Sequence, residues 1–134
     1  MTGAIVLDAS YAVAMVMGDD TSPVLAADVL VAELVAPAIW TLEIANTLLV
    51  NQRRGRVNAA QLQELLAVLA ALKVQVQPGV ALSIDHWCQF SGVHGLTTYD
   101  AQYLDLAMQK RCGIATCDPR LAQAAARVGL PVYA

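Results

Sequence analysis

Four acidic residues follow or interrupt apolar segments of the chain, and they are Asp8, Glu43, Asp100 and Asp118. An ionised carboxylate is costly to bury unless cations or hydrogen-bond donors compensate its charge. Several carboxylates that converge on one pocket are typical ligands of hard divalent metal ions. The pattern therefore indicates metal-assisted hydrolysis, for which phosphodiesters are the natural substrate.

The composition favours a single folded domain spanning residues 1–134. Of these residues 57% are hydrophobic and 14% are charged, which is enough apolar surface for a buried core. The longest uncharged stretch, His86–Tyr99, is too short and too polar to span a bilayer, so we expect no membrane segment. The segment before Asp8 lacks the basic start of a secretory signal, and we expect a cytoplasmic protein. The three cysteines lack C-x-x-C spacing and are expected to be small core residues.

A net charge of −3 is unusual for a sequence-independent nucleic-acid binder, but the charge is unevenly spread. Basic residues cluster at 53–56 and 110–111. Metal ions bound by the four acids would leave the working surface far less negative. Composition alone therefore leaves the partner open.

Apolar periodicity and helix-capping residues predict alternating strands and helices. Strands are expected at 4–8, 35–37, 74–76, 113–116 and 131–133, and helices at 9–17, 22–31, 40–54, 59–72, 79–91, 98–111 and 119–128. Gly55 is expected to end one helix, whereas Asn58 and Thr98 are expected to cap the starts of two others. Short parallel strands joined by helices predict an α/β sandwich.

The predicted sheet places the acids near one another, because ligands bind where parallel strands end. Asp8 and Asp118 follow strands, and Asp100 lies in a first helical turn. Glu43 shares a helix face with Asn46 and Thr47, which suggests a polar cavity beside that helix. Each acid also has an ordinary interpretation, as a helix cap or as an ion-pair partner of an arginine. The coincidence of all four favours a shared metal site.

The segments that carry these acids resemble the successive motifs of PIN-domain ribonucleases, most closely the VapC-type toxins of type II toxin–antitoxin pairs. They span residues 5–10, 43–48 with 53–56, 98–107 and 115–122, in the family's order and over essentially the whole chain. The resemblance implies a PIN-like α/β/α sandwich with a short central parallel sheet. Cys117 and Pro119 depart from the residues common in the family, without touching the acids.

The family's functional positions fall on residues of this chain. The resemblance implies catalytic roles for Asp8, Glu43, Asp100 and Asp118, metal binding by Asp8, Asp100 and Asp118, and supporting roles for Ser10, Asn46 and Thr116. Asp105 is an additional acid, expected to support the site from outside or to face solvent. Arg53 and Arg54 are candidates for RNA contact, with helix-dipole complementation as the alternative.

The resemblance further implies a Mg²⁺- or Mn²⁺-dependent endoribonuclease that acts as a toxin and is neutralised by a small cognate antitoxin. A homodimer is also expected, because this family commonly dimerises. Two alternatives stay open: a metal-dependent phosphatase or other nuclease on the same acidic pocket, and a catalytically silent PIN-like binding module. A serine nucleophile is disfavoured because Ser10 lacks a histidine partner, and neither His86 nor His94 matches a family position.

Overall fold

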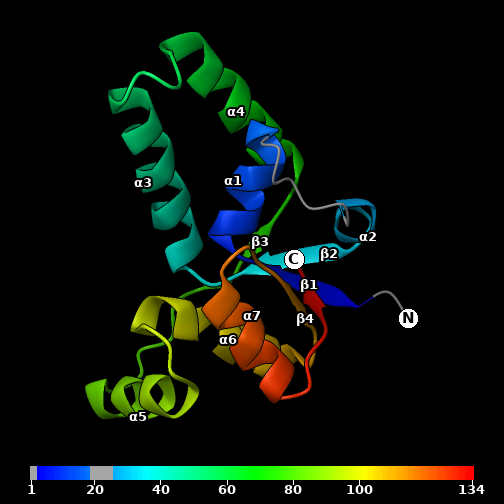
Figure 1. Cartoon of the computed structure of the whole chain (residues 1–134), viewed down its shortest axis with the longest axis vertical. Coiled ribbons are helices and arrows are strands. Elements are labelled where there is room, and N and C mark those ends of the chain that lie inside the picture. The colour runs from blue at the N-terminus through cyan, green and yellow to red at the C-terminus, as the bar shows by residue number, and fades with distance from the viewer. Residues whose placement is uncertain (1–2, 19–25) are drawn as a thin grey trace.

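The computed structural model describes residues 3–18 and 26–134, and its centre is a parallel sheet of five strands (Figure 1). The strands are β1 (Ala4–Leu7), β2 (Glu33–Ala36), β3 (Gln75–Val76), β4 (Gly113–Ala115) and β5 (Val132–Tyr133). Their spatial order is β3-β2-β1-β4-β5, so that β1 lies in the middle and pairs with β2 and β4. The predicted α/β sandwich with a parallel sheet is confirmed.

Helices cover both faces of this sheet. They are α1 (Ala9–Met17), α2 (Ala26–Leu30), α3 (Ile39–Arg53), α4 (Ala59–Ala71), α5 (Ile84–His94), α6 (Thr98–Lys110) and α7 (Pro119–Arg127). Figure 1 shows α1, α3 and α4 on one side of the strands and α5, α6 and α7 on the other. Within the described ranges, no helix is both long enough and apolar enough to cross a bilayer.

The core fills the space between the sheet and the two helical layers. Its fully buried side chains come from the strands and from the inner faces of the helices, and include Val6, Leu7, Tyr11, Val35, Tyr103, Leu104, Ile114 and Leu121. The central strand β1 is buried on both faces, as expected for a parallel strand between two helical layers. The sheet is therefore a rigid support for the loops that leave its carboxyl edge.

Glycine and capping residues in the sequence correctly predicted several helix ends. Gly18 and Gly55 follow α1 and α3 with φ of 63° and 75°, a left-handed conformation that glycine adopts without steric cost. Asn58 begins α4 with a capping box, in which Asn58 and Gln61 each accept the other's backbone N–H at 2.8 Å. The α3–α4 hairpin consequently turns within a few residues.

The predicted helix over 79–91 is wrong at its start, because α5 begins only at Ile84. Ser83 is its N-cap and accepts the backbone N–H of His86 at 3.1 Å. Residues 79–83 form an irregular segment instead, in which Gly79 comes close to Ala38. This segment borders a cleft that Trp87 and Asp105 also line.

Other expectations need smaller corrections. Thr97, rather than Thr98, caps α6 by accepting the backbone N–H of Asp100 at 3.1 Å. The start predicted for the helix over 22–31 lies outside the described residues, and α2 covers Ala26–Leu30. Of the three cysteines only Cys112 is buried, whereas Cys88 and Cys117 are exposed, so the core prediction is wrong for two of them.

Candidate active site at the carboxyl edge of the sheet

Asp8 lies at the end of the central strand β1 and is only 5% exposed. One of its carboxylate oxygens, Oδ2, accepts hydrogen bonds from the hydroxyls of Ser10 and Thr116, both at 2.6 Å. Burial raises the pKa of Asp8, the negative charge of Asp118 raises it further, and the two hydroxyls lower it. No side chain of the described residues donates to the second carboxylate oxygen, and a backbone hydrogen bond from Ala9 also lowers the pKa of Asp8.

The two hydroxyls also join the loops that follow β1 and β4. Ser10 Oγ accepts the backbone N–H of Cys117 at 3.1 Å, and Thr116 Oγ1 accepts that of Asp118 at 3.0 Å. Because each oxygen receives one proton from the backbone, its own proton is directed to Asp8. The orientation of Asp8 is therefore fixed from both sides.

Asp118 combines a structural role with a place beside the other acids. Its Oδ1 caps α7 by accepting the backbone N–H of Arg120 at 2.9 Å. Its carboxyl group also forms a hydrogen bond with Asp100, which lies in the first turn of α6. Asp118 thus caps α7 and also lies beside Asp100.

Asp100 shows most clearly that the acids interact. Its pKa is raised from 3.8 to about 6, first by burial, then by the charge of Asp118 and the hydrogen bond with it. The charges of Asp8 and Glu43 add to the increase. Four carboxylates from four different segments of the chain therefore share one electrostatic environment.

Glu43 reaches this environment from α3 and is held there by Tyr103 of α6. The Tyr103 hydroxyl donates a hydrogen bond to Glu43 Oε1, and the tyrosine side chain is fully buried. Burial raises the pKa of Glu43, the hydrogen bond from Tyr103 lowers it, and the charge of Asp8 raises it. Tyr103 was not singled out from the sequence. Its spacing of three residues from Asp100, which places both on one helix face, is the signal that could have identified it.

A divalent cation fits the charge of this site. No lysine, arginine or histidine of the described part contributes to the pKa of Asp8, Glu43 or Asp100. Within residues 3–18 and 26–134, no three His, Cys, Asp or Glu side chains form a ready-made metal cage. Mg²⁺ keeps several of its waters and needs only one or two direct carboxylate ligands, so a complete cage is not required. Asp8, Asp100 and Asp118 are the residues that would hold the ion.

Other polar side chains of α3 and α6 have contacts of their own. Asn46 is exposed, and the Thr47 hydroxyl donates at 2.9 Å to the Glu43 carbonyl of the same helix. Asp105 lies on α6 and accepts a hydrogen bond from Gln109 at 2.8 Å. It is absent from the groups that shift the pKa of Asp8, Glu43 or Asp100, and it lines a separate cleft.

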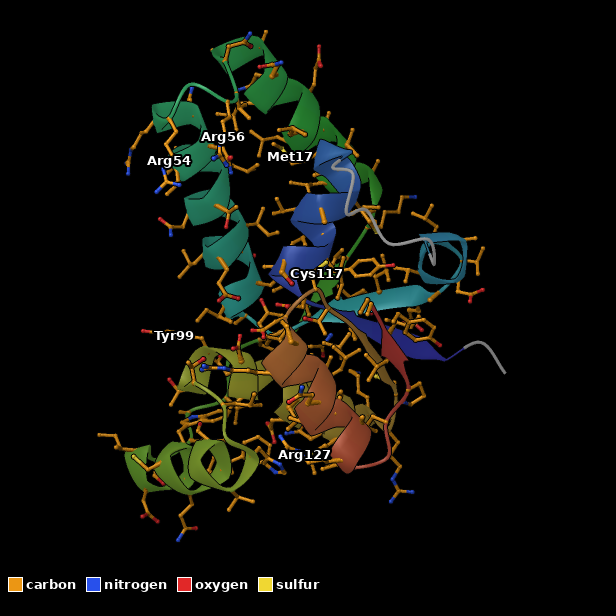
Figure 2. All side chains as sticks on the ribbon, in the orientation of Figure 1. Met17, Arg54, Arg56, Tyr99, Cys117 and Arg127 are labelled. Carbon is orange, nitrogen blue, oxygen red and sulfur yellow. The ribbon has the colours of Figure 1, made fainter. Side chains whose placement is uncertain are left out.

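The basic residues lie far along α3 from the acids. Arg53 is ten positions after Glu43, which corresponds to about 15 Å along a helix axis. In Figure 2, Arg54 and Arg56 lie at the tip of the α3–α4 hairpin, whereas Cys117, the neighbour of Asp118, lies near the sheet. A substrate would have to extend over several nucleotides to touch both places.

Comparisons with known proteins bear on the fold and on the family. A family model described as "PIN domain" matches residues 5–127. Among solved structures, the chain is similar to PAE2754 from Pyrobaculum aerophilum, with a TM-score of 0.69 and 23% sequence identity. The alignment covers 98% of this chain and 84% of that one, and at this identity it shows a shared fold. The search of curated proteins found no match.

Proposed function

The chain belongs to the PIN-domain family, whose members are generally metal-dependent nucleases, and from this premise we propose that it is a Mg²⁺- or Mn²⁺-dependent endoribonuclease. The observation that carries the proposal is the raised pKa of Asp100, caused by burial and by three neighbouring carboxylates. Such mutual repulsion is relieved when a divalent cation binds, and phosphodiester hydrolysis is the chemistry that this ion serves. The resemblance to VapC-type toxins supports RNA as the substrate.

Each acid has a distinct task in this proposal. Bound Mg²⁺ or Mn²⁺ would supply a water of lowered pKa and would neutralise charge on the phosphate. Asp8 is fixed by Ser10 and Thr116, so it would bind the ion in one orientation. Asp100 and Asp118 form a hydrogen bond through a shared proton, and the bound ion would replace that proton. Glu43, positioned by Tyr103, would orient the attacking water.

We further propose that the nuclease is a cytoplasmic toxin held inactive by a small antitoxin. An apolar cavity of about 310 Å³ between α3 and α4 supports a bound partner. The Trp40 indole nitrogen, which lines it, is buried without a hydrogen-bond acceptor among the described residues. The partner would cover this cavity and extend a basic side chain toward the acids. Exposed apolar side chains of α3 and α4, such as Leu42 and Leu66, support the additional proposal of a homodimer.

Substituting Asp8→Asn tests the nuclease proposal, because it removes one negative charge with almost no change in volume. We expect Mn²⁺-dependent RNA cleavage to fall by roughly 100-fold or more while the circular dichroism spectrum is unchanged. Asp85→Asn is the matched control, since Asp85 is exposed on α5. Cleavage by the Asp8→Asn protein at the wild-type rate would remove Asp8 from the active site.

The choice of substrates in the same assay separates a ribonuclease from the two alternatives, a phosphatase or other nuclease and a catalytically silent binding module. RNA, single-stranded DNA and p-nitrophenyl phosphate are each incubated with wild-type protein and Mn²⁺ or a chelator. Hydrolysis of the phosphate monoester with intact RNA would indicate a phosphatase. Mn²⁺ binding without hydrolysis of any substrate would indicate a silent binding module.

A further inference from the structure

A cleft larger than the apolar cavity between α3 and α4 lies at the same edge of the sheet as the acids. Its volume is about 540 Å³, and its walls come from the loops after β2 and β3, from α5 and from one face of α6. Pro37 and Ala38 directly follow β2, which is the neighbour of the β1 strand that carries Asp8. Neighbouring strands are about 4.8 Å apart, so this wall begins within reach of a substrate bound at Asp8.

The polar side chains of this cleft include several hydrogen-bond acceptors, namely the amide oxygens of three glutamines and the carboxylate of Asp105, beside the donor Lys110. The side-chain nitrogens of Gln77, Gln102 and Gln109 already donate to Gln75 O, Thr98 O and Asp105 Oδ2, at 3.3, 3.4 and 2.8 Å. Their amide oxygens and the second oxygen of Asp105 have no donor among the described residues. Asp105 is half-buried and already has Gln109 as a hydrogen-bond donor and His86 as a favourable electrostatic neighbour, and a ligand that offers adjacent N–H groups would satisfy its second oxygen.

An aromatic ring forms another wall of the cleft. The half-buried Trp87 indole packs edge-to-face with His86 and Phe90, with ring centroids 5.0 and 6.2 Å apart, and these contacts fix its orientation. Aromatic side chains in such clefts stack against nucleobases regardless of their identity. The cleft thus places an aromatic ring and a carboxylate group in one concave surface.

A second hollow adjoins this cleft beside Trp87. Trp87 and Gln102 also line this hollow of about 280 Å³, together with Thr98. Thr98 is in the same first turn of α6 as Asp100. Because Thr98 and Asp100 are two positions apart, their side chains point to different sides of α6, and RNA bound at the acids would have to pass the start of α6 to reach Trp87.

We propose that this cleft binds an unpaired nucleobase of the RNA substrate and prefers guanine, an inference that rests on the ribonuclease function proposed above. The base would stack on Trp87, and its N1–H and N2–H groups would donate to Asp105. Guanine is the base that presents two adjacent donors of this kind to one carboxylate. Lys110, at the far end of the cleft, would meet a phosphate.

Binding of the four nucleoside 5′-monophosphates to the full chain tests this proposal, measured by tryptophan fluorescence in the presence of a chelator. The chelator removes divalent ions, so binding reports the cleft and not the cation at the acids. We expect GMP to bind about tenfold or more tightly than AMP, CMP or UMP. Trp87→Leu should weaken GMP binding by about tenfold or more, whereas Trp87→Phe keeps an aromatic face and should retain it. Since both variants remove the Trp87 signal, their affinities are measured by calorimetry.

Asp105→Asn tests the source of the preference, because it replaces an acceptor oxygen with a donor nitrogen. We expect the four nucleotides to bind this variant with similar affinity. Asp85→Asn removes the same charge outside the cleft and should keep the preference for GMP. The proposal would be overturned if the wild type bound all four nucleotides with equal affinity, or if Asp105→Asn and Asp85→Asn weakened the preference for GMP equally. Absence of RNA cleavage would refute the ribonuclease function. The nucleotide-binding experiment does not depend on cleavage, so it tests the cleft separately.

Discussion

Neutralising Asp100 should stabilise the metal-free protein at neutral pH. Its folded-state pKa of about 6 lies above the ordinary value of 3.8, because burial and the carboxylates of Asp118, Asp8 and Glu43 disfavour the charged form. Asparagine has the shape of a protonated aspartic acid and carries no charge. The Asp100→Asn protein therefore keeps the side-chain volume and loses the repulsion.

The size of the effect follows from the pKa. Each pKa unit corresponds to about 1.4 kcal/mol, so the rise from 3.8 to about 6 sets an upper limit of roughly 3 kcal/mol. Asp100 is partly exposed, and screening by solvent reduces this value to about 1–2 kcal/mol. A gain of this size in the free energy of unfolding is readily measured by urea denaturation.

The gain should depend on pH with a defined sign. Between pH 3.8 and about 6 the folded wild type binds more protons at Asp100 than the unfolded chain does, so its stability falls as the pH rises. The advantage of Asp100→Asn is then complete above the folded pKa and fades toward pH 4. Asp85→Asn, the exposed control, should show no such gain. A loss of stability at neutral pH in chelator, or a gain of equal size at pH 4, would refute the repulsion argument.

Two further predictions concern the hydrogen bond between Tyr103 and Glu43, and the arginines at the end of α3. Tyr103→Phe leaves Glu43 Oε1 without its donor and should lower the free energy of unfolding by about 1–2 kcal/mol at neutral pH in urea denaturation, and by less where Glu43 is protonated. Tyr99→Phe, an exposed change on the same helix, should leave the free energy of unfolding unchanged, and equal effects of the two substitutions would contradict the contact. Replacing Arg53 and Arg54 together by Gln should weaken RNA binding and flatten its salt dependence in a filter-binding assay, while a short phosphodiester is cleaved as before; an unchanged salt slope would assign the pair to another role.

Residues at strand ends were predictable from the sequence because their positions follow from local pattern. Asp8 and Asp118 come directly after apolar strands, and parallel strands bring their carboxyl ends to one edge. Thr116 and Ser10 could be associated with Asp8 through the family motifs alone. The polar contacts that fix Asp8 thus agree with what the resemblance implied for these two hydroxyls.

The contacts of Glu43 and the start of α5 were not predictable in the same way. Tyr103 and Glu43 are 60 positions apart, and their contact depends on how α3 and α6 lie relative to each other. Residues 79–83 have an apolar composition compatible with a helix, but the Ser83 cap and the approach of Gly79 to Ala38 decide otherwise. Propensity yields here to tertiary packing. That irregular segment lines part of the cleft beside Trp87.

The topology of the sheet also determines when the acidic site can form during protein synthesis. The hydrogen bond from Thr116 to Asp8 joins residues 108 positions apart, through the pairing of β4 with the central strand β1. At roughly 5–20 residues per second, a ribosome needs about 5–20 s to add this length of chain. For most of that interval Asp8 and Glu43 are already made, but the strand that brings Thr116 and Asp118 to them is not. A nascent chain next to messenger and ribosomal RNA therefore lacks the assembled acidic site until β4 has been made.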